Sequence, residues 1–153
     1  MVLLDALDRI AAAKPAYAIG EIISAAPDVD RDLFGRLTRS IRVAGGRVTL
    51  YASRSDWALR VSEWLWGEAR AGYFRGMPLI APGVDTIDIT AAGTSLFALN
   101  HDLYTSSPML VSDMKRIIHL GARPPDKRTS EFERLETKEG VYWRMRPSQT
   151  PAQ

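Results

Sequence analysis

The stretch RVTLYASRSDWAL, residues 47–59, decides the fold, because it changes from an extended pattern to a helical one within a few residues. Residues 47–52 are rich in β-branched and aromatic side chains and predict a strand. Ser53, Ser55 and Asp56 follow, and all three are residue types that cap helices. The apolar residues beyond them recur at helical spacing: Trp57, Val61, Trp64 and Leu65. We expect this stripe to pack against the sheet, with Trp66 off the face.

The same alternation of strand and helix extends in both directions from this stretch. Further strands are predicted at 18–25 and 84–89, and further helices at 3–13, after Asp30, and between Ser107 and Gly121. Residues 67–83 are rich in glycine and proline and predict a long surface loop. Residues 135–137 and 141–145 predict a small hairpin. Strands separated by helices indicate right-handed crossovers on a parallel sheet, and therefore an α/β fold.

Length and composition describe one globular domain and exclude several functional classes. The chain has 153 residues, 46% of them hydrophobic and 25% charged, with a formal charge of +2. It has no cysteine, which excludes disulfides and thiolate chemistry. No apolar run is long enough to predict a membrane span, and no signal peptide is expected, so we expect a cytoplasmic protein by default. The charge is too small to predict a nucleic-acid partner.

Function is expected at the carboxyl ends of the predicted strands, where parallel sheets bind their ligands. Three loops meet there, at residues 27–30, 53–56 and 90–106. Asp28 lies in the first loop, Asp56 in the second and His101 in the third. Each has a simpler structural interpretation: Asp28 as a turn residue, Asp56 as a helix cap that Ser53 or Ser55 could replace, and His101 as an exposed loop residue.

Six short stretches, in order, resemble the C-terminal half of an α/β-hydrolase, in an uncharacterised esterase/lipase-like bacterial branch. They are residues 2–7 (VLLDAL), 25–30 (AAPDVD), 50–59 (LYASRSDWAL), 81–88 (APGVDTID), 100–104 (NHDLY) and 111–114 (VSDM). The resemblance implies a partial α/β-hydrolase fold, in which the three parallel strands correspond to the sixth, seventh and eighth of the hydrolase sheet. The expected division is residues 1–121 as hydrolase, 122–147 as an extension with the hairpin, and 148–153 as a disordered tail.

The resemblance also implies a catalytic assignment. In the family's order of serine, acid and histidine, Asp56 takes the position of the acid and His101 that of the base, with Asp28 as the alternative acid. The implied activity is hydrolysis of a small carboxylic ester or similar acyl substrate. The nucleophile is absent, because no G-x-S-x-G turn occurs in the sequence. The chain is therefore expected to be inactive alone, and the alternative is a noncatalytic interaction module built on the remnant sheet.

Other chemistries find little support in the sequence. No cofactor is expected, and the two histidines, His101 and His119, lack the spacing of metal ligands. We interpret His119 as the basic end of a helix. Four cations, Arg70, Arg75, Arg123 and Lys127, are interpreted as scattered surface charge. Self-association is expected, because the strand at 18–25 would present an unpaired apolar edge.

Overall fold

Five strands form one mixed sheet in the computed structural model, which describes residues 6–7, 9–10, 13, 20–43, 46–92, 107–121 and 123–147. The strands are β1 (Glu21–Ala25), β2 (Arg47–Ala52), β3 (Val84–Asp88), β4 (Phe132–Thr137) and β5 (Gly140–Met145). Their order in the sheet is β1-β2-β3-β5-β4. The first three strands and β5 run parallel, and β4 runs antiparallel to β5. The predicted α/β fold and the hairpin are confirmed, but the sequence did not predict that the hairpin extends the sheet beside β3.

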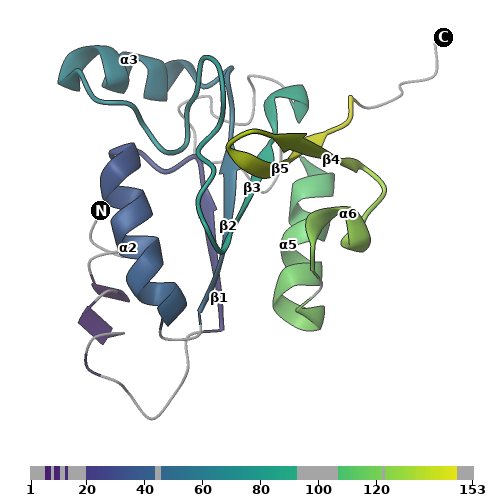
Figure 1. Cartoon of the computed structure of the whole chain (residues 1–153). Helices are drawn as coiled ribbons and strands as arrows, with labels where there is room; N and C mark the ends of the chain where they lie inside the picture. Colours follow the sequence, from purple (N-terminus) through teal and green to yellow (C-terminus); the bar gives the residue numbers. More distant parts are fainter. Residues whose placement is uncertain are drawn as a thin grey trace, which may run out of the picture.

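Helices cover both faces of this sheet. They are α2 (Arg31–Val43), α3 (Trp57–Trp66), α5 (Pro108–Leu120) and α6 (Pro125–Arg128), and a 3-10 turn, η1 (Thr90–Ala92), follows β3. Figure 1 shows α2 and α5 on opposite sides of the strands. The predicted limits of α5 are confirmed, since Ser107 caps it and Gly121 ends it in the left-handed conformation. The predicted helix at 3–13 falls largely outside the described residues.

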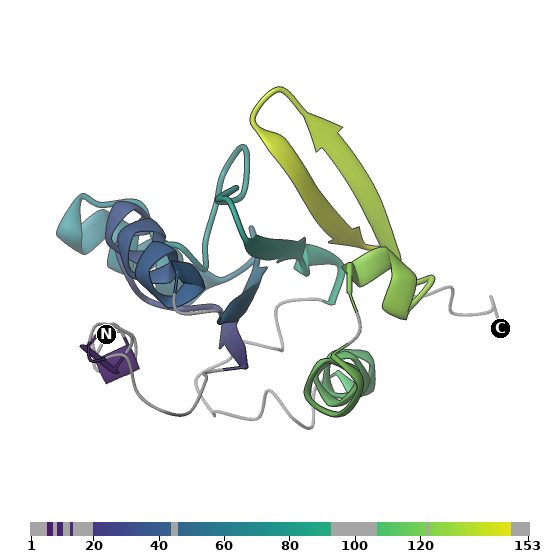
Figure 2. The ribbon, with the colours of Figure 1, turned by 60° about the horizontal axis from the view of Figure 1, so that its bottom comes forward.

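Alternate residues of each strand enter two separate cores. Between the sheet and α2, Ile22, Val48 and Leu50 pack against Phe34 and Ile41. The second core lies on the opposite face of the sheet, between the strands, α5 and the base of the hairpin. Its residues include Tyr51, Ile87, Leu110, Ile117, Phe132 and Trp143. The hairpin projects from the side of the sheet in Figure 2, and its base completes this second core. The second core therefore depends on residues that are distant in sequence.

The prediction that α3 packs Trp64 and Leu65 inward is wrong. Their exposed fractions are 79% and 63%, and Trp66 is 71% exposed. Leu59, in the first half of the helix, is buried instead. In Figure 1, α3 lies at the end of the sheet, above α2, so its last turn extends past the elements that would cover it. Ile118 of α5 is also 63% exposed. The described residues do not include the side chain of Trp57.

The loop after α3 crosses the carboxyl ends of β1 and β2. Ala71 N donates to Val29 O (2.8 Å), Gly72 N donates to Pro27 O (3.1 Å), and Ser53 N donates to Gly72 O (3.0 Å). Gly72 packs so closely that a Cβ there would lie 2.5 Å from the carbonyl carbon of Ala26. The predicted surface loop thus includes a segment that is hydrogen-bonded to both strand ends.

In the part of the chain that the structure describes, no helix combines the length and apolar character needed to cross a membrane.

Candidate functional site at the carboxyl ends of the strands

Asp28 and Asp56 lie at the same edge of the sheet, after β1 and β2. Asp28 Oδ1 accepts a hydrogen bond from Ser62 Oγ (2.8 Å) and lies 3.3 Å from Arg70 Nε. Asp56 is buried, with 3% of its surface exposed. The two carboxylates are close enough that the charge of Asp28 raises the pKa of Asp56, although burial raises it more. The structure therefore brings together the two acids that the sequence singled out.

Asp56 itself caps α3. Its Oδ1 accepts a hydrogen bond from Leu59 N (2.9 Å), and this bond opposes the effect of burial on its pKa. The sequence interpretation allowed Ser53 or Ser55 to take the cap, but Ser53 Oγ accepts from Ser55 N (3.0 Å) instead. A carboxylate has about four acceptor positions, so one cap bond leaves room for a second donor. The cap holds the carboxyl group of Asp56 in a fixed position.

The third predicted residue, His101, lies outside the described residues, so its pairing with Asp56 stays a prediction. Its segment leaves the described chain at Ala92 and returns at Ser107. Both residues lie at the carboxyl end of the sheet and line one cavity. His119 lies in the last turn of α5, as predicted for a structural histidine.

The end of β3 is tied to both neighbouring strands. Asp88 Oδ1 accepts from Thr90 N (3.0 Å) and from its hydroxyl, and Arg144 Nε of β5 lies 3.4 Å from Asp88 Oδ2. On the other side, Arg54 N donates to Thr90 Oγ1 (3.0 Å). The guanidinium of Arg54 stacks over Phe74, 4.9 Å from the ring centroid. These contacts place two arginines on either side of the end of β3, Arg54 after β2 and Arg144 on β5.

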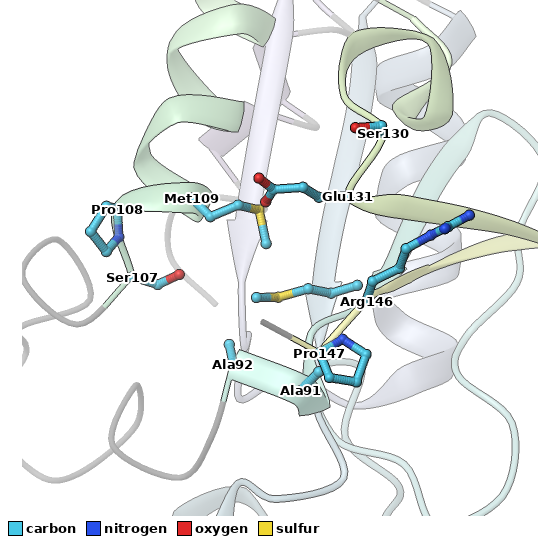
Figure 3. Close-up of a pocket in the computed structure, with 10 residues that line it drawn as sticks. Ala91, Ala92, Ser107, Pro108, Met109, Ser130, Glu131, Arg146 and Pro147 are labelled. Atoms are coloured by element: carbon cyan, nitrogen blue, oxygen red, sulfur yellow. The ribbon is translucent and has the colours of Figure 1, made fainter. Parts of the chain in front are cut away.

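Two neighbouring cavities open at this edge. The larger, of about 680 Å³, lies between η1, the start of α5 and the ends of the hairpin strands. Figure 3 shows Ser107, Pro108 and Met109 on one side of it and Arg146 and Pro147 on the other. The smaller, of about 350 Å³, is lined by Arg54, Asp88, Thr90 and Arg144. Three residues, Ala91, Met145 and Pro147, line both cavities. Their sizes are those of small-molecule sites.

A buried polar cluster lies on the α5 face, and sequence reasoning missed it. Arg128 donates to both oxygens of Asp113, at 2.6 and 3.0 Å, and the hydroxyl of Tyr51 donates to Asp113 Oδ2 (2.5 Å). The side chains of Asp113 and Arg128 are completely buried. Burial first, and then the charge of Asp113, raise the pKa of Tyr51, so this hydroxyl stays protonated. Asp113 was detectable in principle, because it interrupts the apolar stripe between Leu110 and Ile117.

The cluster continues toward the amino ends of the strands. Arg123 forms ion pairs with Glu21 of β1 and Asp85 of β3, and Arg128 Nη1 lies 4.0 Å from Asp85. Arg70 is also inward, with 8% exposure, beside Asp28. The interpretation of Arg70 and Arg123 as scattered surface charge is therefore wrong, because their guanidinium groups join strands and loops. Among the described residues, no group of three or more histidines, aspartates or glutamates is arranged to hold a metal ion.

Comparisons with known proteins agree with this architecture. Searches of curated proteins and of solved structures gave no match. One family model, described as an alpha/beta hydrolase of unknown function (DUF900), matches residues 1–123. The match covers β1, β2 and β3, their crossover helices and α5, and it ends before the hairpin. The chain belongs to this family of alpha/beta hydrolases of unknown function.

Proposed function

We propose that the chain supplies the acid and the base of a serine-hydrolase site that cleaves carboxylic esters. In this proposal Asp56 is the acid, His101 is the base, and Asp28 is the alternative acid. Membership of an alpha/beta hydrolase family supports the type of reaction. The location of both carboxylates at the carboxyl ends of consecutive parallel strands supports the assignment of the acid.

The observation that carries the proposal is the environment of Asp56. Its carboxyl group is buried at a strand end, fixed by Leu59 N, and affected by the charge of Asp28. A triad acid needs a fixed carboxylate that accepts the Nδ1–H of the histidine and stabilises the imidazolium formed during reaction. Asp28 is more exposed and already pairs with Arg70 and Ser62, which favours Asp56 over Asp28.

The reaction divides into two steps. In the first, the serine oxygen attacks the ester carbonyl while His101 takes the serine proton; His101 then gives this proton to the departing alcohol, leaving an acyl-serine. In the second step, His101 takes a proton from water, which attacks the acyl-serine; His101 then returns this proton to the departing serine oxygen, so the acid is released and the serine is restored. The sequence of 153 residues contains no G-x-S-x-G turn, so the proposal requires the serine from a different polypeptide segment.

The pKa of His101 tests the pairing without any turnover. The chain has only two histidines, so a His119→Gln variant assigns both imidazole signals in NMR titrations. We expect His101 to titrate above the ordinary value of about 6.5, because a nearby carboxylate stabilises the imidazolium. Asp56→Asn should lower this pKa by about one unit, whereas Asp28→Asn should change it little.

The other outcomes are equally informative. If Asp28→Asn rather than Asp56→Asn lowers the pKa of His101, then Asp28 is the acid. A His101 pKa that neither variant changes contradicts the proposal. In p-nitrophenyl ester assays, the chain should show no turnover above that of a His101→Ala control. Turnover that His101→Ala abolishes would reveal a nucleophile within the chain, and Ser95 would be tested first.

A further inference from the structure

The last turn of α3 presents three consecutive large apolar side chains to solvent, Trp64, Leu65 and Trp66. They include two of the four tryptophans of the chain. The turn is held in place, because Gly67 N donates to Glu63 O (2.9 Å) and the loop beyond it is hydrogen-bonded to the strand ends. A contiguous apolar surface of this kind marks a contact site. The tryptophan ring, apolar with one N–H, suits a boundary between water and hydrocarbon.

Positive charge is concentrated in the two helices on this side of the sheet. Together α2 and α3 contain five arginines and two acidic residues, a net charge of +3, whereas the whole chain carries +2. Asp32 and Glu68 are exposed nearby, and Glu63 pairs with Arg75 (3.3 Å). Four of the five arginines are exposed, and within the described parts of the chain none of the four forms an ion pair: Arg36, Arg39, Arg42 and Arg60.

The apolar turn and the arginines belong to neighbouring surfaces. Arg31 N, at the start of α2, donates to Ala69 O, three residues after Trp66 (2.9 Å). The end of α3 therefore lies close to the first turn of α2, and both ribbon views show the two helices next to each other on one side of the sheet (Figures 1 and 2). The buried residues of α2 face the sheet, so Arg36 and Arg39, three positions apart and exposed, point away from it.

We propose that this surface, formed by Trp64, Leu65, Trp66, Arg36 and Arg39, binds the headgroup layer of a membrane that contains anionic lipids. The three apolar side chains insert between the headgroups, and the two arginines lie against lipid phosphates. A second copy of the chain suits this surface less well, because a symmetric contact would bring the same arginines together. The inference goes beyond the proposed function and does not depend on it.

Co-sedimentation of the full chain with vesicles measures binding directly. The vesicles are phosphatidylcholine alone, and phosphatidylcholine mixed with phosphatidylglycerol in equal parts. We expect stronger binding to the mixed vesicles, and this preference should fall as salt is added, because salt screens the arginines. Bromine on the lipid acyl chains should quench the tryptophan fluorescence of the bound protein, because Trp64 and Trp66 reach the hydrocarbon boundary.

Paired variants separate the apolar contribution from the charge. Trp64→Ser/Trp66→Ser should weaken binding to the mixed vesicles about tenfold for each tryptophan and remove most of the quenching. Arg36→Gln/Arg39→Gln should weaken it about fivefold for each arginine, with little effect on phosphatidylcholine alone.

Matched controls replace equally exposed residues elsewhere. Ile118→Ser/Leu120→Ser changes apolar residues of α5, on the opposite side of the sheet (Figure 1). Lys115→Gln/Lys138→Gln removes two exposed cations, one on α5 and one in the hairpin turn. Both controls should bind vesicles almost as wild type does. All four double variants should keep a cooperative circular-dichroism melt, since every replaced side chain is exposed.

Three results would overturn the inference. The first is absence of binding to the mixed vesicles, and the second is equal binding to both kinds of vesicle. The third is a loss of binding in the α5 and hairpin controls as large as in the α3 and α2 variants. Sedimentation without vesicles detects the competing occupant: a dimer that Trp64→Ser/Trp66→Ser converts to a monomer would assign the surface to contact between copies of the chain.

Discussion

The buried cluster of Tyr51, Asp113 and Arg128 should show strong energetic coupling. Removing one member of a buried ion pair leaves the other charge without compensation, which costs about 3–5 kcal/mol. We therefore expect Arg128→Met or Asp113→Leu to lower the free energy of unfolding by this amount, because both side chains are fully buried. Tyr51→Phe removes one hydrogen bond to a charged group and should cost about 2 kcal/mol.

The double variant Arg128→Met/Asp113→Leu is the decisive measurement. It removes both charges and leaves the Tyr51 hydroxyl without its acceptor, a cost of about 1–3 kcal/mol, while Asp85, which loses its contact with Arg128, keeps its ion pair with Arg123. Its total loss should therefore be smaller than that of either single variant, and far smaller than their sum. Urea unfolding at pH 7 measures the free energy of unfolding of wild type and of the four variants. Single variants that each cost less than about 1 kcal/mol, or single effects that simply add in the double variant, would contradict the expected coupling.

Three further predictions concern the cap of α3, the crossing loop and the hairpin. Burial raises the pKa of Asp56 in the folded chain above its ordinary value of 3.8. The folded state therefore binds the proton of this carboxyl group more tightly than the unfolded state does. The stability that this gives is complete below pH 3.8 and is lost as pH rises through the pKa of the folded chain. Asp56→Asn keeps the cap but has no charge to bury, so urea unfolding should show a higher free energy of unfolding than wild type, by more at pH 7 than at pH 4. Equal differences in the free energy of unfolding at the two pH values would contradict this. Gly72→Ala should lower the free energy of unfolding by about 1–3 kcal/mol, because the added Cβ would meet the backbone of Ala26. The control Gly35→Ala lies in α2 with open space around it and should raise the free energy of unfolding by about 0.5–1 kcal/mol. Thermal melts that show similar stability for both variants would contradict the close packing of Gly72. A chain ending at residue 123 lacks both hairpin strands and should lose its cooperative circular-dichroism melt, and a retained sharp transition would show that β3 does not need β5.

The sequence predicted the elements whose signals are local. The strand at 47–52 and the helix between Ser107 and Gly121 agree with the structure, because β-branched runs and capping residues act within a few positions. The hairpin was also recognised, although β4 begins three residues earlier than predicted. Its pairing with β3 was not predicted, because the contact between Ile87 and Trp143 joins residues far apart in the chain.

The errors also have physical causes. Helical periodicity identified an apolar stripe in α3, but periodicity does not say whether another element covers each turn, and Trp64 remains exposed. Four cations were interpreted as surface charge, and this failed for Arg70 and Arg123, because the carboxylates that they pair with lie far away in the sequence. For the candidate site, the sequence located Asp28 and Asp56 at one edge, but it gave no sign of the two cavities beside them.

The crossing loop determines the direction from which a ligand can approach the site. Main-chain hydrogen bonds attach residues 69–73 to the ends of both β1 and β2, so that part of the edge is occupied by backbone. The cavities lie farther along the same edge, at the ends of β3 and β5. Under the proposed function, a substrate would therefore approach Asp56 from the side of the hairpin. Substitutions in the hairpin of this chain would then change which molecules reach this edge without altering the position of Asp56.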